Sequence, residues 1–301
     1  METKDCLDLR AVVILIIVAL LWGLNHPAIK ISNQRVAPVF ASTLRSMVAA
    51  ICGLIYCFKK GEKVSHKDII LFHGAMVGLL FGVEFARIYL GLLYTDAARS
   101  VLFVYLSLFV VAVGAHFFLK GDRLTFLKIM GLVLAFAGIF VVFGWRPRTA
   151  KPAMYYGDIL QIAAAVLWGA TTLYIKKLMA GKVQPTNTFL YQLFFSIPTL
   201  LFVSIILEPK WLYKPDPYVI GSLFYQSVII AFVTYFIWFK LIHQYSVSRL
   251  SAFTFLTPIF GVFFGVRFLH EEFTVSLMIG LPLVSAGIFL VNWRRRAALL
   301  T

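Results

Sequence analysis

Ten long apolar segments dominate the sequence and limit what the chain can fold into. They cover roughly 11–31, 36–58, 68–94, 97–119, 124–144, 156–179, 186–207, 218–242, 247–269 and 274–293. Each holds about 20 residues or more, the length that an α-helix needs to cross roughly 30 Å of hydrocarbon. Because lipid offers no partner to backbone amides, and a β-barrel would show alternating segments of about ten residues, helices are expected. The pattern predicts an all-α integral membrane protein with ten transmembrane helices.

Charged residues are scarce and lie mainly between the apolar segments. Only 14% of the 301 residues are charged, against roughly 25% in a typical soluble domain. The net charge is +15, but its basic residues flank the predicted spans, so we do not expect nucleic-acid binding. Of the 28 lysines and arginines, three lie within spans, 16 lie on the side of the N-terminus and nine on the other. Since cytoplasmic loops retain basic residues, we expect both termini in the cytoplasm and the protein in a bacterial inner membrane.

Two halves of the chain repeat each other. LLWGLNHPAIKI (20–31) aligns with VLWGATTLYIKK (166–177) at a shift of 146, and AGIF occurs at both 137–140 and 286–289, a shift of 149. The repeat predicts two units of five helices, 1–150 and 151–301. Because five is odd, the second unit enters the membrane from the opposite side, and the two units form inverted repeats around a central cavity. Secondary transporters are commonly built in this way.

Several motifs resemble the drug/metabolite transporter (DMT) superfamily and, within it, the EamA-type transporters. They are the WG pair that opens each half, LRSMVAA (44–50), LLYTDAARS (92–100), FLTPIF (255–260), and the KGDRLT and HEEFT turns (120–125 and 270–274). The resemblance covers almost the whole chain. It implies ten helices around a central cavity, alternating access, and amino acids or related amphoteric metabolites as substrates.

The first helix of each half carries a polar and aromatic stripe. At about 100° per residue these side chains fall on one side of their helix, where lipid would disfavour them. They either line a shared cavity, which we favour, or form hydrogen bonds across helix interfaces. The stripe residues are Trp22, Asn25, His26, Ile29 and Lys30 in the first half, and Gln161, Trp168, Thr171, Thr172 and Lys176 in the second.

Three charged residues lie deep inside predicted spans. Glu84 is the acidic residue we place well inside a span, and Arg87, one turn later, is its expected partner. Arg45 lies deep in the second span and is either a substrate contact or a structural residue. The two arginines leave one excess positive charge, which an anionic substrate group would balance. We assign Glu84 to a substrate amine or to proton coupling, and we expect Lys30, Lys176 and Lys240 to snorkel toward the membrane surface.

Further candidates combine aromatic rings with hydroxyl or amide groups, a mixture that suits an amphipathic organic solute. Pro27 and Pro258 are expected bends, because proline removes a backbone hydrogen bond. The additional substrate-binding candidates are Tyr105, Gln226, Tyr235, Trp238 and Thr254.

The chain is therefore expected to export a small organic metabolite by alternating access, with a proton as a candidate coupling ion. The cysteines and histidines show no metal-ligand spacing, and no phosphate-binding or catalytic-triad motif occurs, so we expect no metal, no cofactor and no enzyme activity. The alternative is an integral-membrane enzyme that acts on a lipid-like substrate. It would use the cluster His270, Glu271 and Glu272, which we instead expect to form a helix start. Oligomeric state is not predicted.

Overall fold

Helices make up almost all of the chain that the computed structural model describes, namely residues 8–62, 68–118, 124–144, 151–179, 182–244 and 253–292. The first half holds α1 (Leu9–Ser32), α2 (Pro38–Lys60), α3 (Asp68–Gly91), α4 (Ala97–Val104), α5 (Ser107–Phe118) and α6 (Phe126–Gly144). The second half holds α7 (Met154–Tyr174), η1 (Ile175–Met179), α8 (Pro185–Leu207), α9 (Pro217–Phe224), η2 (Tyr225–Thr234), α10 (Tyr235–Gln244), η3 (Phe253–Phe255), α12 (Leu256–Leu269) and α13 (Val275–Asn292). Segments η1 and η2 are π-helical, and η3 is a 3-10 turn.

Within the described ranges, eight helical segments are long and apolar enough to cross a membrane. Two shorter apolar helices, α12 and α13, occupy the last two predicted spans. Residues 245–252 and 293–301, which the sequence assigns in part to those spans, lie outside the described residues. For the described residues the predicted all-helical fold is thus confirmed, and eight helices of spanning length plus two shorter apolar helices are consistent with a membrane protein.

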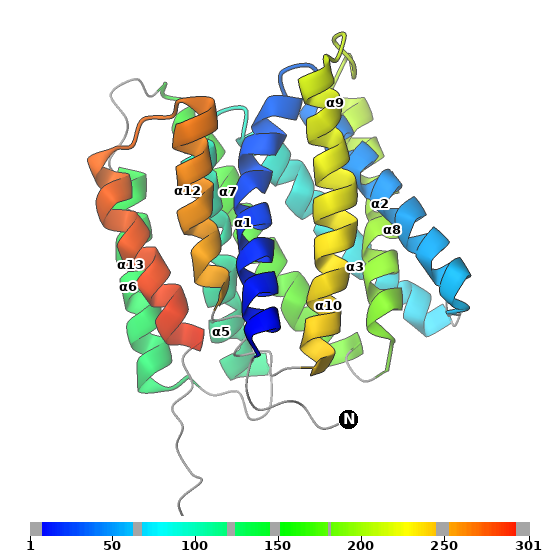
Figure 1. Cartoon of the computed structure of the whole chain (residues 1–301), viewed down its shortest axis with the longest axis horizontal. Coiled ribbons are helices and arrows are strands. Elements are labelled where there is room, and N and C mark those ends of the chain that lie inside the picture. The colour runs from blue at the N-terminus through cyan, green and yellow to red at the C-terminus, as the bar shows by residue number, and fades with distance from the viewer. Residues whose placement is uncertain are drawn as a thin grey trace, which may run out of the picture.

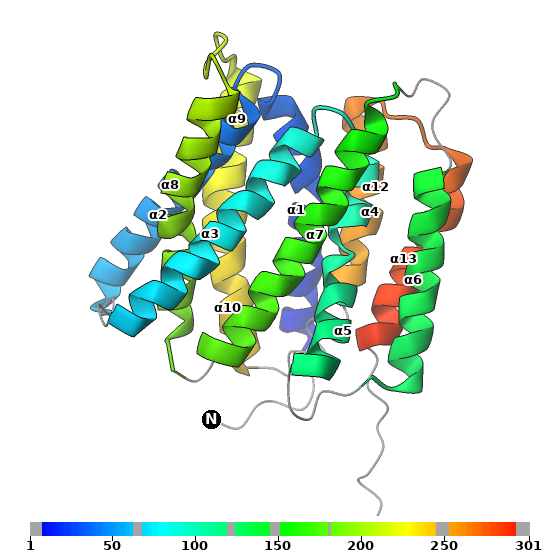
Figure 2. The same ribbon diagram turned by 180° about the vertical axis from the view of Figure 1, so that it is seen from behind.

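The helices form two layers. In Figure 1, α13, α12, α1 and the α9 to α10 helix lie in front, and α6, α5, α7, α3 and α8 lie behind them, as the reverse view in Figure 2 shows. The first residues of α1 and the last residues of α13 are at the same end of the bundle, and α7 runs opposite to α1. Contact between the layers includes α6 with α13, whereas α1 packs on α12 within the front layer and α3 packs on α7 and α8 within the back layer.

Glycines allow the closest approach between helices. A Cβ atom on Gly78 of α3 would lie 2.4 Å from the Cβ of Phe195, and one on Gly74 would lie 2.9 Å from that of Tyr191, so α3 packs tightly on α8. Gly74, Gly78 and Gly82 recur every four residues in the sequence, a small-residue spacing that predicts such a helix contact.

A second glycine contact joins α6 to α13. A Cβ on Gly131 would lie 2.7 Å from the carbonyl oxygen of Gly287, and one on Gly138 would lie 2.8 Å from that of Gly280. No L-residue with a side chain fits there without a backbone shift, so these four positions fix how closely the two helices pack.

The expected bends differ in their local structure. Pro27 lies inside α1, which continues as one helix to Ser32. Pro258 is in the first turn of α12, where proline costs no intrahelical hydrogen bond. Helix geometry instead changes just before α12, in η3, and at Tyr105–Leu106 between α4 and α5.

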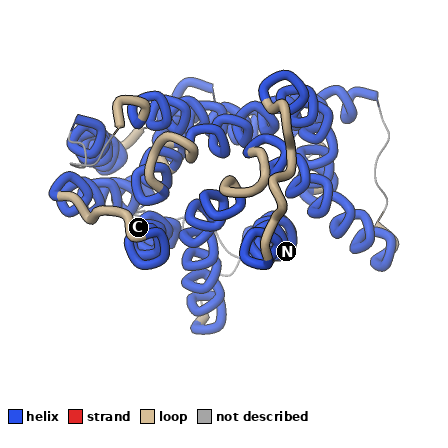
Figure 3. Tube along the Cα trace, turned by 90° about the horizontal axis from the view of Figure 1, so that it is seen from above, coloured by secondary structure: helices blue, strands red, loops and turns tan. Residues whose placement is uncertain are grey.

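Loops at the end opposite the N-terminus tie the halves together (Figure 3). Backbone hydrogen bonds join Ala37 to Trp211 and Tyr213 to Arg35. The Glu208 carboxylate accepts hydrogen bonds from the first turn of α2, at 2.6 Å from Val39 N and 3.0 Å from Phe40 N. A negative charge at a helix N-terminus is favourable, so the loop after α8 stabilises the start of α2.

Candidate functional site

A pair of opposite charges lies in the interior of the bundle, on neighbouring helices. Arg45 of α2 is 1% exposed and Glu84 of α3 is 2% exposed, and the two groups interact electrostatically. Arg45 is seven residues after the start of α2 and Glu84 is seven before the end of α3, so each lies about 10 Å along the axis from the same end of the bundle. Burial at this depth is costly for a charge unless it has a partner.

Polar atoms of this pair remain without partners. Among the described residues, Nε and Nη1 of Arg45 and Oε2 of Glu84 have no hydrogen bond although all three are buried. The Arg45 guanidinium instead lies 4.0 Å from the ring centroid of Phe85, a cation–π contact. Buried polar atoms are nearly always satisfied, so unsatisfied donors beside an unsatisfied acceptor are what a binding site for an amphoteric ligand would offer.

Tyr235 connects this pair to a wall of aromatic rings. It interacts with both Arg45 and Glu84, and its ring centroid is 6.1 Å from that of Trp22. Trp22 is in turn 5.2 Å from Trp238 and donates a hydrogen bond from Nε1 to the Thr234 hydroxyl at 2.8 Å. Four helices, α1, α2, α3 and α10, thus bring predicted site residues together.

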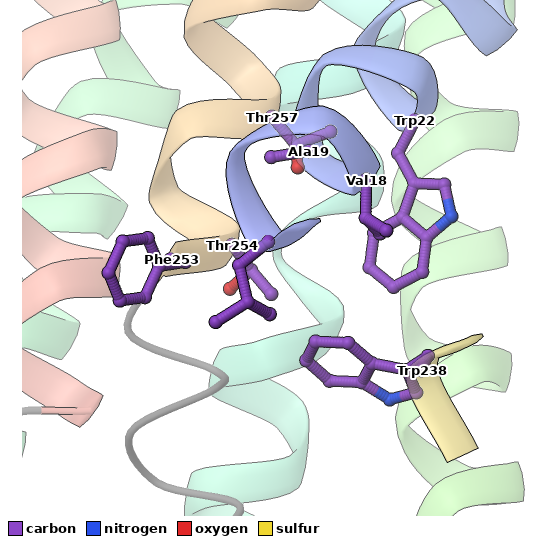
Figure 4. A pocket seen from close by; sticks show the side chains of 8 residues that line it. Val18, Ala19, Trp22, Trp238, Phe253, Thr254 and Thr257 are labelled. Carbon is purple, nitrogen blue, oxygen red and sulfur yellow. The ribbon is translucent and has the colours of Figure 1, made fainter. Parts of the chain in front are cut away.

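A small pocket lies beside these rings. Figure 4 shows the indoles of Trp22 and Trp238 on one side of it and Phe253 and Thr254 on the other. Its volume is about 10 Å³, which is room for about one water molecule. This pocket is too small to hold an organic solute in the described structure.

Residues from the break between α4 and α5 in the first half, and from α7 in the second, approach the same region. Tyr105 packs edge to face on Trp168, with centroids 6.0 Å apart, and lies within electrostatic reach of Tyr235. Thr171 and Thr172 donate their hydroxyl hydrogens to carbonyl oxygens of their own helix, at 2.8 and 2.9 Å. The hydroxyl groups of both threonines thus already have hydrogen-bond partners within α7. The rings of Tyr105 and Trp168 are therefore the main contribution of this side to the site.

Other stripe residues form hydrogen bonds between helices, the alternative that the sequence left open. His26 Nδ1 lies 2.8 Å from the Ser100 hydroxyl of α4, and Gln161 donates to the Ile88 carbonyl at 3.0 Å. Asn25 differs, because its buried Oδ1 has no partner in the described part of the chain.

Gln226 belongs to a separate network. It accepts a hydrogen bond from Tyr89 and donates to Ser222 at 2.9 Å and to Ser32 at 3.2 Å. Its amide is fully engaged in joining α1, α3 and η2.

The predicted pairing of Glu84 with Arg87 is wrong. No ion pair joins them in the described structure, and Arg45 is the basic neighbour of Glu84. Residues three apart on a helix are neighbours only if both side chains turn toward each other. Packing of α2 against α3 supplies a buried arginine instead, and Arg87 remains half-buried.

Lys30, expected to snorkel toward the membrane surface, takes part in ion pairs near the end of α1. Its ammonium lies 2.9 Å from Glu271 and 3.2 Å from Asp96. Glu271 also accepts hydrogen bonds from the backbone of Ala97 and Ala98, at 2.7 and 2.9 Å. The acidic turn therefore does serve a helix start, that of α4. Lys176 is exposed, and the side chain of Lys240 lies outside the described residues.

A second buried ion pair was missed at the sequence level. Asp158 of α7 and Arg99 of α4 are 0% and 1% exposed and form a salt bridge, and Asp158 also accepts a hydrogen bond from Thr95. The sequence singles out Glu84 as the acidic residue well inside a span and assigns no role to Arg99. Asp158 lies two residues after the predicted start of its span, which was the available signal.

Comparisons with known proteins show which structures and sequences this chain is similar to. A solved structure that is 21% identical superposes with a TM-score of 0.67 and covers 93% of this chain and 96% of its own, which supports the fold alone. An uncharacterized transporter of Bacillus subtilis, YoaV, is 26% identical over 281 residues, covering 92% of this chain and 94% of its own. A probable amino-acid metabolite efflux pump of Escherichia coli is 25% identical over 295 residues, covering 94% and 96%.

The family comparison covers both halves. The model of the EamA-like transporter family matches residues 9–144 and again residues 155–293. Nearly every helix described above lies within these two matches, including those that carry Arg45, Glu84 and Tyr235. The chain belongs to the EamA-like transporter family of the drug/metabolite transporter superfamily.

Proposed function

We propose that this protein is a secondary transporter that exports a small amphoteric metabolite, such as an amino acid, by alternating access. The observation that carries the proposal is the buried Arg45 and Glu84 pair, with unsatisfied polar atoms next to an aromatic wall. A carboxylate of the solute would meet Arg45 and its amine would meet Glu84. Export is favoured by relatives that are named amino-acid metabolite efflux pumps.

The proposal includes ten spans arranged as two inverted five-helix repeats, 1–150 and 151–301. Support comes from the glycine contacts between α6 and α13. Adding 149 converts Gly131 to Gly280 and Gly138 to Gly287, and each of the two α6 glycines contacts the repeat equivalent of the other one. The same shift places the helix break at Tyr105 on Thr254 in η3. A two-fold rotation that exchanges the two layers would produce both relations.

The way in which the halves are joined supports alternating access. In the described state the pocket is too small for a metabolite, and the loops opposite the N-terminus are held by ion pairs and a helix cap. Rocking of the layers would open one end at a time, with η3 and the Tyr105–Leu106 break as bending points together with Pro27 and Pro258.

Proton coupling is assigned to Glu84. Its carboxylate is buried, retains an unsatisfied oxygen and has Arg45 as its basic neighbour. Protonation would release Arg45 to a substrate carboxylate, which links the two binding events. Both termini are assigned to the cytoplasm, as the loop charges predict.

The substrate class is tested by counterflow into liposomes that contain the purified full chain. Leucine is compared with 4-methylpentanoate, which lacks the amine, and with 3-methylbutylamine, which lacks the carboxylate. Leucine is expected to exchange fastest. Arg45→Gln is expected to slow leucine exchange about tenfold or more, because a hydrogen bond to a buried charge is lost.

Glu84→Gln is expected to abolish the response of leucine transport to a pH gradient. Arg87→Gln is the matched control, since it lies on the same helix one turn away, and it should retain both rate and gradient response. Equal effects of Glu84→Gln and Arg87→Gln would remove Glu84 from coupling. Conversion of any of the three probes to a product without a sealed compartment would favour the membrane-enzyme alternative.

A further inference from the structure

A second hollow lies on the surface of the bundle, between α5, α6 and α7. Its volume is about 420 Å³, within the roughly 300–1,000 Å³ that small-molecule sites occupy. Its lining includes Phe109 and Val113 of α5, Phe136 of α6 and Leu173 of α7. All its lining residues are apolar, whereas a site for a polar metabolite needs a few convergent polar groups. The groove therefore suits a hydrocarbon chain and not an amphoteric solute.

A positively charged side chain lies at one end of this groove. The ammonium of Lys177, in η1, lies 5.4 Å from the ring centroid of Phe118, which lines the groove. Lys177 is exposed, so its charge is available to a ligand. From Phe118, the last residue of α5, the groove extends nine residues along this helix to Phe109, about 13 Å. A charged group at the helix end and an apolar channel of this length match a lipid head group and the upper part of its chain.

We propose that the groove binds an anionic phospholipid of the surrounding bilayer, with one acyl chain along α5 and its phosphate at Lys177. Positive charge near a membrane surface attracts anionic head groups. A second copy of this chain fits less well, because helix contacts in membranes favour small residues and this rim exposes Phe117, Phe118 and Phe136. The inference requires a membrane-embedded protein but is independent of which solute is transported.

Native mass spectrometry of the purified full chain in detergent tests the head-group contact. Palmitoyl-oleoyl phosphatidylglycerol is expected to bind more tightly than the phosphatidylcholine with the same chains, and glycerol 3-phosphate should not bind. Lys177→Ala is expected to weaken phosphatidylglycerol binding about fivefold, the effect of one basic residue near an anionic surface. Lys60→Ala, an exposed lysine at the end of α2, is the charge-matched control and should leave binding unchanged.

A groove-filling variant tests the acyl chain. Ala170 of α7 lines the groove, so Ala170→Leu should weaken both lipids, whereas Ala286→Leu on an exposed position of α13 should weaken neither. Unchanged melting temperatures in detergent establish that the variants are folded. The proposal is overturned if Lys177→Ala and Lys60→Ala bind phosphatidylglycerol equally, or if Ala170→Leu retains wild-type lipid binding. Loss of a protein dimer in Ala170→Leu without loss of lipid would assign the groove to a second copy.

Discussion

Asp158 and Arg99 are each other's counter-ion in a part of the bundle where neither charge meets solvent. Arg99 also donates to the carbonyl oxygen of Val142 at the end of α6, so the pair joins three helices. Two charges taken from water gain little net stability together, but removing one leaves the other buried and uncompensated. The fold therefore requires both charges of this pair where α4, α6 and α7 meet.

Asp158→Asn is expected to lower the free energy of unfolding by about 3 kcal/mol, because Arg99 loses its counter-ion. Thermal and detergent-induced unfolding of the purified protein would measure it. Asp216→Asn is the matched control: Asp216 caps α9 through Val219 N at 2.9 Å, and asparagine is an equally good N-cap. Equal losses in the two variants would contradict the structural assignment of Asp158.

At the scale of helices, backbone contact at glycine sets the distance between α6 and α13. A Cβ on Gly138 would lie within 2.9 Å of Leu283 and Val284 as well as near the Gly280 carbonyl, so none of its neighbours leaves room for it. Helices in lipid gain no hydrophobic effect from association, and close van der Waals packing takes its place.

Gly138→Ala is therefore expected to lower the melting temperature in detergent, despite the higher helix propensity of alanine. Gly221→Ala on α9 is the control, since nothing lies within 4 Å of a Cβ there, and it should be neutral or stabilising by up to about 1 kcal/mol. If Gly138→Ala proved as stable as Gly221→Ala, the tight α6 to α13 contact would not be a constraint.

At the scale of the whole molecule, the end opposite the N-terminus is closed by contacts between the two halves. Lys30 and the start of α4 belong to the first half, and Glu271 belongs to the second. Since Glu271 holds both, its release would free the α12 to α13 turn from α1 and α4. This cluster is the part of the structure that must break if the solute leaves at this end.

Glu271→Gln is expected to raise access to this end several-fold, because the variant loses its charge interaction with Lys30. The measurement is the rate at which a membrane-impermeant maleimide labels Ala97→Cys in a variant whose own three cysteines are replaced. Glu272→Gln, an exposed neighbour, should not change the rate. Faster labelling in both variants would point to a general loosening of the turn.

The local properties of the chain followed from sequence because they depend on short segments. Apolar length identified the membrane helices, the spacing of Gly74, Gly78 and Gly82 predicted a helix contact, and the rarity of charge in spans singled out Arg45 and Glu84. Partners did not follow, because they depend on which helices pack together. Glu84 meets Arg45 across α2 and α3, Lys30 meets Glu271 across 241 positions, and Asp158 meets Arg99 across α7 and α4.

Sequence alone thus determined that the chain forms apolar helices in a membrane, with intramembrane charges at its centre, since the cost of exposing backbone and charge to lipid acts on each segment separately. Tertiary structure decided which charges neutralise each other, which polar groups of the stripe join helices, and which atoms remain unsatisfied. The free energy of those choices comes from contacts between distant segments, and no local pattern encodes it.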